Sequence, residues 1–310
     1  TAFIRVEGAT GGMQLSVVVP TLDSREQLAR TLDALGEHVP AAEVVVVNGP
    51  STDGTTGMVR DRADVDVLVE VADRTVAPAR NAGIDHASGD VVALVDRGLS
   101  VTADWVDALA AGLAEADVVT GPVRERLRGG MTAESVESAS VAGREVIFVN
   151  GGNVAFRRPV LDALDGFDEY LDVGSARDCA LRLAGMDVSV HWSSAMGVAR
   201  DVGADGGERD VDRAWKYRSL AYRLVKNYGV RPRVVARLVG QPGRDALGSL
   251  RDVVRGDATP SGWLGTGRDV LGGIAVGVKD GLWARTLDRS TRRNPYGRSS
   301  RSERAVAVYD

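Results

Sequence analysis

The chain has 310 residues, of which 44% are hydrophobic and 26% charged, as expected for one large globular domain or one domain with an appendage. Its one cysteine, Cys179, excludes an intrachain disulfide framework and fits a reducing compartment. The longest apolar run of the C-terminal part, residues 270–278, is far shorter than the roughly 20 residues of a membrane-spanning helix.

The net charge of −5 conceals an asymmetry between two parts of the chain. Residues 1–200 hold 17 Lys and Arg against 30 Asp and Glu, whereas residues 201–310 hold 21 against 13. A basic C-terminal third attracts phosphate groups, on nucleic acid or on anionic lipid. It carries no known nucleic-acid-binding motif, so we do not expect a nucleic-acid partner. The low lysine and high aspartate content is typical of a salt-adapted (halophilic) or GC-rich source.

The first half alternates β-branched runs with helical stretches. We expect strands at residues 15–19, 43–47, 65–71, 91–95 and 117–121, and helices at 25–35, after 51 or 52, at 77–87 and at 104–114. This alternation predicts an α/β fold with a mostly parallel sheet flanked by helices, whose ligand lies beyond the carboxyl ends of the strands. Asn48, Asp53 and Asp96 all follow strands at that edge, which locates a candidate site.

The second half departs from the alternation. We expect an extended stretch at 147–156, a short helix at 178–185, a strand at 187–192, and helices over 209–287 with breaks at Pro232, Pro242 and Pro260. The Arg/Ser-rich end is expected to be loosely ordered. These patterns divide the chain into an N-terminal extension (1–13), an α/β domain (14–205), a basic helical extension (206–288) and a tail (289–310).

Seven segments resemble, in order and spacing, those of family-2 glycosyltransferases with a GT-A fold. They are LSVVVPTLD, EVVVVNGPSTDGT, APARNAGI, VVALVD, GGNVAFRR, DGFDE and DCALRLAG, within about residues 14–200. The later stretch KYRSLAYRLVKNYGVRP resembles haloarchaeal enzymes of lipid-linked glycan and protein N-glycosylation assembly.

The resemblance implies inverting transfer of a sugar from a UDP- or GDP-linked donor. The acceptor would be a glycan or a lipid-linked molecule such as a polyprenyl or dolichyl phosphate. The protein would then be cytoplasmic and peripheral on the inner face of the cell membrane, held there by its basic C-terminal region.

Nucleotide contacts fall, by resemblance, on residues after the first two strands and in the ARN segment. These are Thr21, Asp23, Asn48, Ser51, Asp53, Arg80 and Asn81. Relatives mostly carry Asp where this chain has Asn48, but an amide also donates and accepts hydrogen bonds. An alternative stays open for the Ser and Asp residues, which are also good helix caps, and for Arg80, which is also placed to pair with Asp85.

Asp96 is followed by Arg97, where relatives continue to a second Asp that helps bind Mn²⁺ or Mg²⁺. Residues 196–200 (MGVAR) also lack the His that relatives often place there. One hypothesis is that Arg97 or Arg200 supplies the positive charge to phosphate that a metal supplies elsewhere. The other is that Asp96 alone anchors the metal through water. Metal dependence is therefore left open.

Asp178 is the candidate general base, because it is the one carboxylate between Asp172 and Asp187. Aligning the LRL letters, however, puts Ser175 and Ala176 at the family's usual acidic pair, and Ser175 with Asp178 also resembles a helix cap. Contacts to the sugar or acceptor fall, by resemblance, on Gly151, Gly152, Asn153, Asp168 and Glu169. The missing carboxylates keep a second interpretation open, a catalytically inactive relative that binds nucleotide or acts as a scaffold subunit in glycan assembly.

Overall fold

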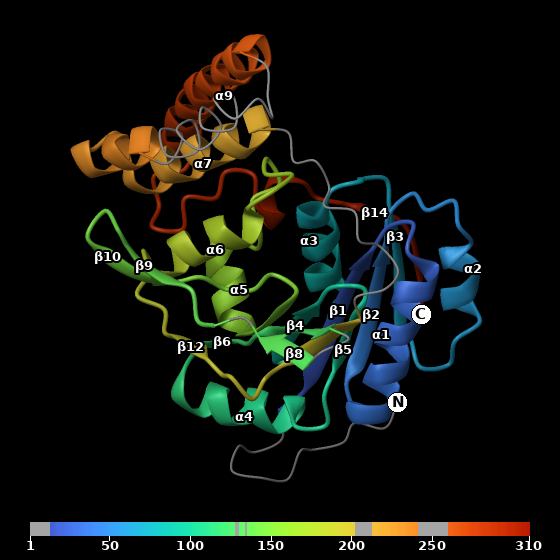
Figure 1. The fold of residues 1–310 in the computed structure, drawn as a ribbon. Helices are drawn as coiled ribbons and strands as arrows, with labels where there is room; N and C mark the ends of the chain where they lie inside the picture. Colours follow the sequence, from blue (N-terminus) through green and yellow to red (C-terminus); the bar gives the residue numbers. More distant parts are fainter. Residues whose placement is uncertain (1–12, 128–129, 134, 202–212, 241–259) are drawn as a thin grey trace. The chain divides into compact units, whose positions relative to one another are not determined.

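The computed structural model describes residues 13–127, 130–133, 135–201, 213–240 and 260–310. These form two compact units (Figure 1). The first comprises the described residues within 1–139, 146–206 and 296–310, and the second those within 140–145 and 207–295.

The first unit is built on an eight-stranded sheet in the order β12-β6-β11-β4-β1-β2-β3-β14. Strands β1 to β4 run parallel, and β11 and β14 run antiparallel to their neighbours. The bounds are Leu15–Thr21 (β1), Glu43–Asn48 (β2), Val67–Val71 (β3), Val91–Val95 (β4), Val118–Thr120 (β6), Asn153–Arg157 (β11), Val190–Trp192 (β12) and Ala305–Tyr309 (β14). The predicted α/β fold class is confirmed.

Helices lie on both faces of this sheet (Figure 1). They are α1 (Arg25–His38), α2 (Thr55–Arg60), α3 (Val76–His86), α4 (Trp105–Glu115), α5 (Arg158–Leu164) and α6 (Ser175–Leu183). A smaller sheet contains β5 (Leu99–Val101), β13 (Val198–Asp201), β7 (Val123–Leu127) and β8 (Gly130–Ala133), and β9 (Ser138–Val141) pairs with β10 (Arg144–Ile147).

The alternation of side chains along β1 explains the two helical layers. Val17 and Val19 pack in one core cluster with Leu28 of α1, whereas Val18 points to the other face, toward α3. A Cβ on Gly83 of α3 would lie 2.2 Å from Cγ1 of Val18, so only glycine allows this helix to approach the strand so closely. Helix α3 is thereby fixed on the sheet.

The C-terminal segment differs from its prediction as a loosely ordered tail. Its 3-10 helix η1 (Arg298–Ser300) and strand β14 belong to the first unit, and β14 pairs antiparallel with β3. Arg60 stacks over the ring of Tyr309 at 3.9 Å, and the hydroxyl of Tyr309 is 3.3 Å from Glu70. The Arg/Ser composition suggested disorder, but these arginines find carboxylates elsewhere in the first unit.

The second unit contains α7 (Arg213–Tyr228), a helix at 232–240 and α9 (Pro260–Leu287). Pro232 and Pro260 each stand at the first helical position, where a missing N–H costs nothing. Three glycines of α9 meet α7, and a Cβ on Gly277 would lie 2.3 Å from the carbonyl oxygen of Arg218. Pro242 and residues 1–12 lie outside the described residues. Within the described ranges, no helix has both the length and the apolar character to cross a membrane.

Candidate active site

A cavity of about 700 Å³ lies beyond the carboxyl end of β4, at the edge of the sheet predicted to hold the ligand. Its walls come from α3, from the segment between β10 and β11, and from the loop that enters α6. The lining includes Arg80, Asp96, Phe148, Gly151, Gly152, Asp172, Ser175, Ala176, Arg177 and Trp192.

Arg80 and Asp96 form an ion pair in the wall of this cavity. The Nη2 atom of Arg80 lies 3.0 Å from Oδ1 and 3.3 Å from Oδ2 of Asp96, so Arg80 does not pair with Asp85. The side chain of Arg80 is only 5% exposed, whereas that of Asp96 is 33% exposed. The Nε of Arg80 is buried and makes no hydrogen bond with any described residue. A buried donor without a partner favours a ligand, because leaving it unsatisfied is costly.

Two glycines make room for this pair. A Cβ on Gly152 would lie 2.8 Å from Oδ2 of Asp96, and one on Gly151 would lie 3.0 Å from Nη1 of Arg80 and 2.8 Å from the Cβ of Ala176. The backbone carbonyl of Gly152 also accepts the Asp96 N–H, at 3.1 Å. The expected close backbone approach is therefore present, and its partners are the two charged side chains. Contact of these glycines with sugar stays a prediction.

Three carboxylates line the cavity, and two of them are engaged. Asp96 pairs with Arg80, and Glu137 accepts two hydrogen bonds from Arg177, at 2.8 and 2.7 Å. Asp172 is exposed and makes no hydrogen bond or ion pair with any residue that the structure describes. It follows the buried Leu171 and stands two residues before Gly174, the N-cap residue of α6, which has a φ of 83°.

Asp178 does not have the surroundings expected of a general base. Its side chain is 0% exposed and pairs with Nε of Arg182 at 2.7 Å, and Arg182 is equally buried. Arg182 also donates to the carbonyls of Leu164 and Gly166. Burial alone would lower the pKa of Arg182, but the charge and the hydrogen bond of Asp178, together with the charges of Cys179 and Asp168, raise that pKa. The assignment of Asp178 is therefore corrected to a structural ion pair that joins α6 to the segment after α5.

The loops after β1 and β2 bring four of the predicted nucleotide-binding residues together. The N–H of Asp23 donates to Oγ of Ser51, which in turn donates to Oδ1 of Asn48 at 2.7 Å. Asp53 accepts the N–H groups of Arg25 and Thr55 and so caps the starts of α1 and α2. Burial would raise the pKa of Asp53, but the hydrogen bonds from Thr55 and Arg25 hold it below its usual value. Asp53 therefore acts as a helix cap, and contact of these residues with a nucleotide base stays a prediction.

Thr21 ends β1 in the same region. Its side chain is buried, and its Oγ1 has no hydrogen-bond partner among the described residues. Nucleotide contact by Thr21 also stays a prediction.

Neither arginine proposed to replace a metal lines the cavity. The Nε of Arg97 donates to Oγ of Ser24 at 2.6 Å, which ties the loop after β4 to the start of α1. Arg200 lies on β13, paired in register with Leu99, and is exposed. The arginines of the cavity are Arg80 and Arg177 instead. Arg177 was missed, although its position directly after Ser175 and Ala176 is a signal that the sequence carries.

Asn81, Asp168 and Glu169 lie away from the cavity lining. Asn81 is buried and exchanges hydrogen bonds with the backbone of Phe167, at 2.9 and 2.8 Å. Glu169 accepts from Asn81 and pairs with Arg304. Asp168 is 0% exposed and accepts the N–H of Tyr170. These residues are corrected from ligand contacts to supports of the loop before α6, because their polar atoms are already engaged within the protein.

Asn153 is likewise a structural residue. Its Oδ1 accepts the indole N–H of Trp105 at 2.9 Å, and its Nδ2 donates to the carbonyl of Met196 at 2.6 Å. Because the side chain is 0% exposed, it cannot also contact a sugar in the cavity.

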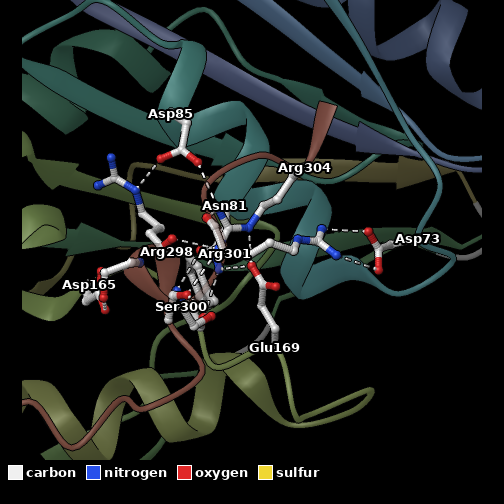
Figure 2. A network of polar contacts seen from close by, with 12 residues as sticks. Asp73, Asn81, Asp85, Asp165, Glu169, Arg298, Ser300, Arg301 and Arg304 are labelled. Atoms are coloured by element: carbon white, nitrogen blue, oxygen red, sulfur yellow. Dashed lines mark hydrogen bonds and ion pairs between the residues drawn. The ribbon is translucent and has the colours of Figure 1, made fainter. Parts of the chain in front are cut away.

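Three arginines of the C-terminal segment form ion pairs with carboxylates of other elements of the first unit (Figure 2). Arg298 binds Asp85 at 2.6 Å, Arg301 binds Asp73 at 2.7 Å, and Arg304 binds Asp85 and Glu169. The pKa of Arg301 is raised, chiefly by its hydrogen bond to Asp73. This network joins the end of β3, the end of α3 and the loop before α6, and thus fixes the helix that carries Arg80.

A divalent ion could be held here by Asp96. Its carboxylate is partly exposed and offers the oxygen ligands that Mn²⁺ and Mg²⁺ use. Within the described part of the chain, however, no group of three or more His, Cys, Asp or Glu side chains could hold a metal by itself. Such an ion would therefore share Asp96 with the oxygens of a ligand.

Comparison with known proteins agrees with this architecture. Residues 16–164 match the model of glycosyl transferase family 2. The glycosyltransferase AglE of Haloferax volcanii is 27% identical over 196 residues, which are 58% of this chain and 60% of that protein. A validoxylamine A glucosyltransferase of Streptomyces hygroscopicus subsp. jinggangensis is 38% identical over 125 residues, 37% of this chain and 30% of that protein. The chain thus spans at most about 60% of the length of these relatives.

Solved structures show the same fold. The mannosyltransferase PcManGT from Pyrobaculum calidifontis, in complex with GDP-Man and Mn²⁺, has a TM-score of 0.56 at 18% identity, covering 90% of this chain and 88% of that one. TarS 1-349 of S. aureus in complex with UDP-GlcNAc has a TM-score of 0.59 at 17% identity, covering 92% and 89%. Residues 16–164 thus match the model of glycosyl transferase family 2, and the fold is the one seen in these solved glycosyltransferase structures.

Proposed function

We propose that the protein transfers a sugar from a nucleotide-sugar donor to a glycan or lipid-linked acceptor, with inversion at the anomeric carbon. The observation that carries the proposal is the Arg80–Asp96 pair in the wall of the 700 Å³ cavity, at the carboxyl end of β4 in a family-2 domain. A cavity of this size accommodates a ligand of several rings.

Arg80 is the residue proposed to bind the donor diphosphate. Its guanidinium is permanently charged and planar, as suits a phosphate ligand, and its buried Nε–H has no hydrogen-bond partner among the described residues. Arg177, across the cavity lining, adds a second positive charge. Both UDP- and GDP-linked sugars are reasonable donors, since the solved relatives hold GDP-Man in one case and UDP-GlcNAc in the other.

Asp96 is the residue proposed to meet the ribose or a Mn²⁺ or Mg²⁺ ion. A bound divalent ion would neutralise the leaving diphosphate, as Mn²⁺ can in the GDP-Man complex of PcManGT. Arg80 and Arg177 line the same cavity, but each is paired there with a carboxylate, Asp96 or Glu137.

Asp172 is proposed as the general base in place of Asp178. An inverting transfer needs a carboxylate that takes the proton of the acceptor hydroxyl as its oxygen bonds to the anomeric carbon and the nucleotide diphosphate leaves. Of the cavity carboxylates, Asp172 is exposed and has no partner among the described residues. A carboxylate not already held by an arginine is the one free to accept that proton.

A lipid-linked acceptor and a peripheral position at the cell membrane are proposed on weaker grounds. The similarity to a haloarchaeal glycosyltransferase and the basic C-terminal third support them. Exposed apolar side chains of the second unit, among them Trp283 at 60% and Leu271 at 68%, are also suited to a membrane interface.

One observation favours a second candidate, a nucleotide-binding protein without transferase activity. Ser175 and Ala176 line the cavity where relatives carry their acidic pair, so the start of α6 contributes no carboxylate to it. Such a protein would bind the nucleotide sugar without transferring it, and would act as a scaffold subunit of a larger glycan-assembly complex.

The test combines binding and turnover. Titration calorimetry with UDP and GDP, first with Mn²⁺ and then with excess chelator, measures nucleotide recognition. Release of UDP or GDP from sugar donors then measures turnover in the wild type, in Asp172→Asn and in the control Glu137→Gln. We expect nucleotide binding in all three and turnover lost only in Asp172→Asn. Binding without turnover in the wild type would favour the second candidate, and absence of nucleotide binding would refute both.

A further inference from the structure

A second cavity, of about 570 Å³, lies entirely within the second unit. On one side is the turn between β9 and β10, with Ser140, Ala142 and Gly143, and on the other is the helix at 232–240, with Arg233 and Arg237. Among the described residues, the lining contains two arginines and no acidic side chain, which gives this part of the cavity a positive charge.

The two arginines are held but not neutralised. They stand four residues apart and therefore on one face of the helix. Nη1 of Arg237 lies 3.4 Å from the carbonyl of Ser140, and Gly143, at φ 90°, leaves space for Nη1 of Arg233, which would lie 3.1 Å from a Cβ there. Neither arginine pairs with a carboxylate of any residue that the structure describes. Most of their N–H donors are thus available to an anion.

The same helix also exposes apolar side chains, on the side about half a turn away from the two arginines. On the helix at 232–240, Val234 and Leu238 are buried, whereas Val235 and Val239 are 44% and 67% exposed. Of the twelve large hydrophobic side chains most exposed among the described residues, eight lie between residues 230 and 287. Single exposed valines are ordinary, but a helix with arginines on one side and exposed valines on the other has the pattern of a helix that lies in a lipid interface.

We infer that this cavity binds the phosphate group of an anionic lipid at a bilayer surface. Arg233 and Arg237 would hold the phosphate through charge-assisted hydrogen bonds, with Val235 and Val239 against the acyl chains. A free phosphate would use the arginines and leave the valines in water, so the apolar face decides for the lipid. The inference deepens the proposed membrane contact, giving it a defined site, and is independent of the nucleotide site in the first unit.

Vesicle sedimentation with the full chain tests the inference, at about 0.15 M salt where charges beyond roughly 8 Å are screened. The probes are vesicles of phosphatidylcholine alone and of phosphatidylcholine with phosphatidylglycerol. The variant is Arg233→Gln/Arg237→Gln, and the control is Arg268→Gln/Lys279→Gln, which removes the same charge from exposed positions of α9. We expect the variant to bind phosphatidylglycerol vesicles roughly 10-fold or more weakly and the control to change less than about 3-fold.

A second pair of measurements separates lipid from free phosphate. Val235→Ser/Val239→Ser is expected to weaken vesicle binding several-fold and to leave calorimetric binding of inorganic diphosphate unchanged. Equal losses in variant and control, no preference for phosphatidylglycerol, full vesicle binding by the serine variant, or a dimer that the serine variant abolishes would each overturn the inference. UDP and GDP binding, measured in the same variants, reports on the proposed function separately.

Discussion

The guanidinium of Arg80 lies 3.0 Å from the carboxylate of Asp96, which joins α3 to the end of β4. This pair sits where the predicted ligand edge of the sheet opens into the cavity. Arg80 is almost completely buried while Asp96 is partly exposed, so the arginine is fixed by the protein and the carboxylate is accessible. The arrangement favours Arg80 as a preorganised anion-binding group.

Arg80→Gln is therefore expected to weaken UDP or GDP binding by about 100-fold, since one charge-assisted contact is worth roughly 1.5–3 kcal/mol. Calorimetry measures the loss. The matched control is Arg177→Gln, whose guanidinium is partly exposed and already pairs with Glu137, and which should lose less than about 10-fold. An equal loss in both variants would contradict the special role of Arg80.

Gly152→Ala tests whether the cavity depends on close backbone approach. A Cβ would lie 2.8 Å from Oδ2 of Asp96, so we expect Asp96 to be displaced and nucleotide or metal binding to fall at least 10-fold. Gly57→Ala in α2 is the control, because a Cβ there meets nothing within 4 Å and should stabilise the protein by about 0.5–1 kcal/mol. Unchanged ligand binding in Gly152→Ala would show that the Asp96 position is not needed.

Asp178→Asn is expected to lower the free energy of unfolding, without a direct effect on the transfer reaction. Removing one partner of a fully buried ion pair costs about 3–5 kcal/mol, and Arg182 would be left charged in the core. Chemical denaturation measures this loss. Asp172→Asn, at an exposed position, should change the free energy of unfolding by less than about 0.5 kcal/mol while abolishing turnover. Normal stability in Asp178→Asn would reopen its role as a base.

Arg304→Gln should loosen the C-terminal segment. Arg304 is 2% exposed and pairs with Glu169 and Asp85, so its loss is expected to cost about 3 kcal/mol of unfolding free energy. Arg289→Gln, at an exposed position in the second unit, serves as the control with little effect. Hydrogen exchange at β14 should accelerate in the first variant only, and slow exchange in both would contradict the network.

The depressed pKa of Asp53 predicts a pH effect of defined sign. Because the folded pKa lies below the usual value of 3.8, the carboxylate stabilises the fold fully above that value. The contribution is lost as pH falls through the lower folded pKa. The stability difference between wild type and Asp53→Asn should therefore shrink below about pH 4, as measured by denaturation at a series of pH values. A constant difference down to pH 2 would exclude this contribution.

The sequence predicts the sheet well, since β-branched runs such as EVVVV read directly as buried strands. It names Asp96 as a site residue because Asp96 follows a strand, and Arg80 and the two glycines by resemblance, and the structure brings these four residues together in one cavity. It fails at buried polar residues. Asn81 and Asn153 look like ligand contacts by their place in short motifs, but their hydrogen bonds run to residues distant along the chain, which no local pattern reveals. Asp178 pairs with Arg182 one turn along the same helix, a spacing that is visible in the sequence, but its complete burial is not.

The same limit explains the C-terminal segment. Its composition is that of a flexible tail, yet Arg298, Arg301 and Arg304 each find a carboxylate more than 130 residues earlier. The alternation in AVAVY is nevertheless a strand signal, and the burial of its side chains alternates in the same way.

The pairing of β14 with β3 also has a consequence for biosynthesis. The first unit begins near the start of the chain and takes its last strand from residues 305–309, with the second unit interposed between. During translation, α7 and α9 leave the ribosome before the strand that caps the sheet exists. The edge of β3 therefore stays unpaired until residues 305–309 have been made, and during this interval it is open to pairing with other chains.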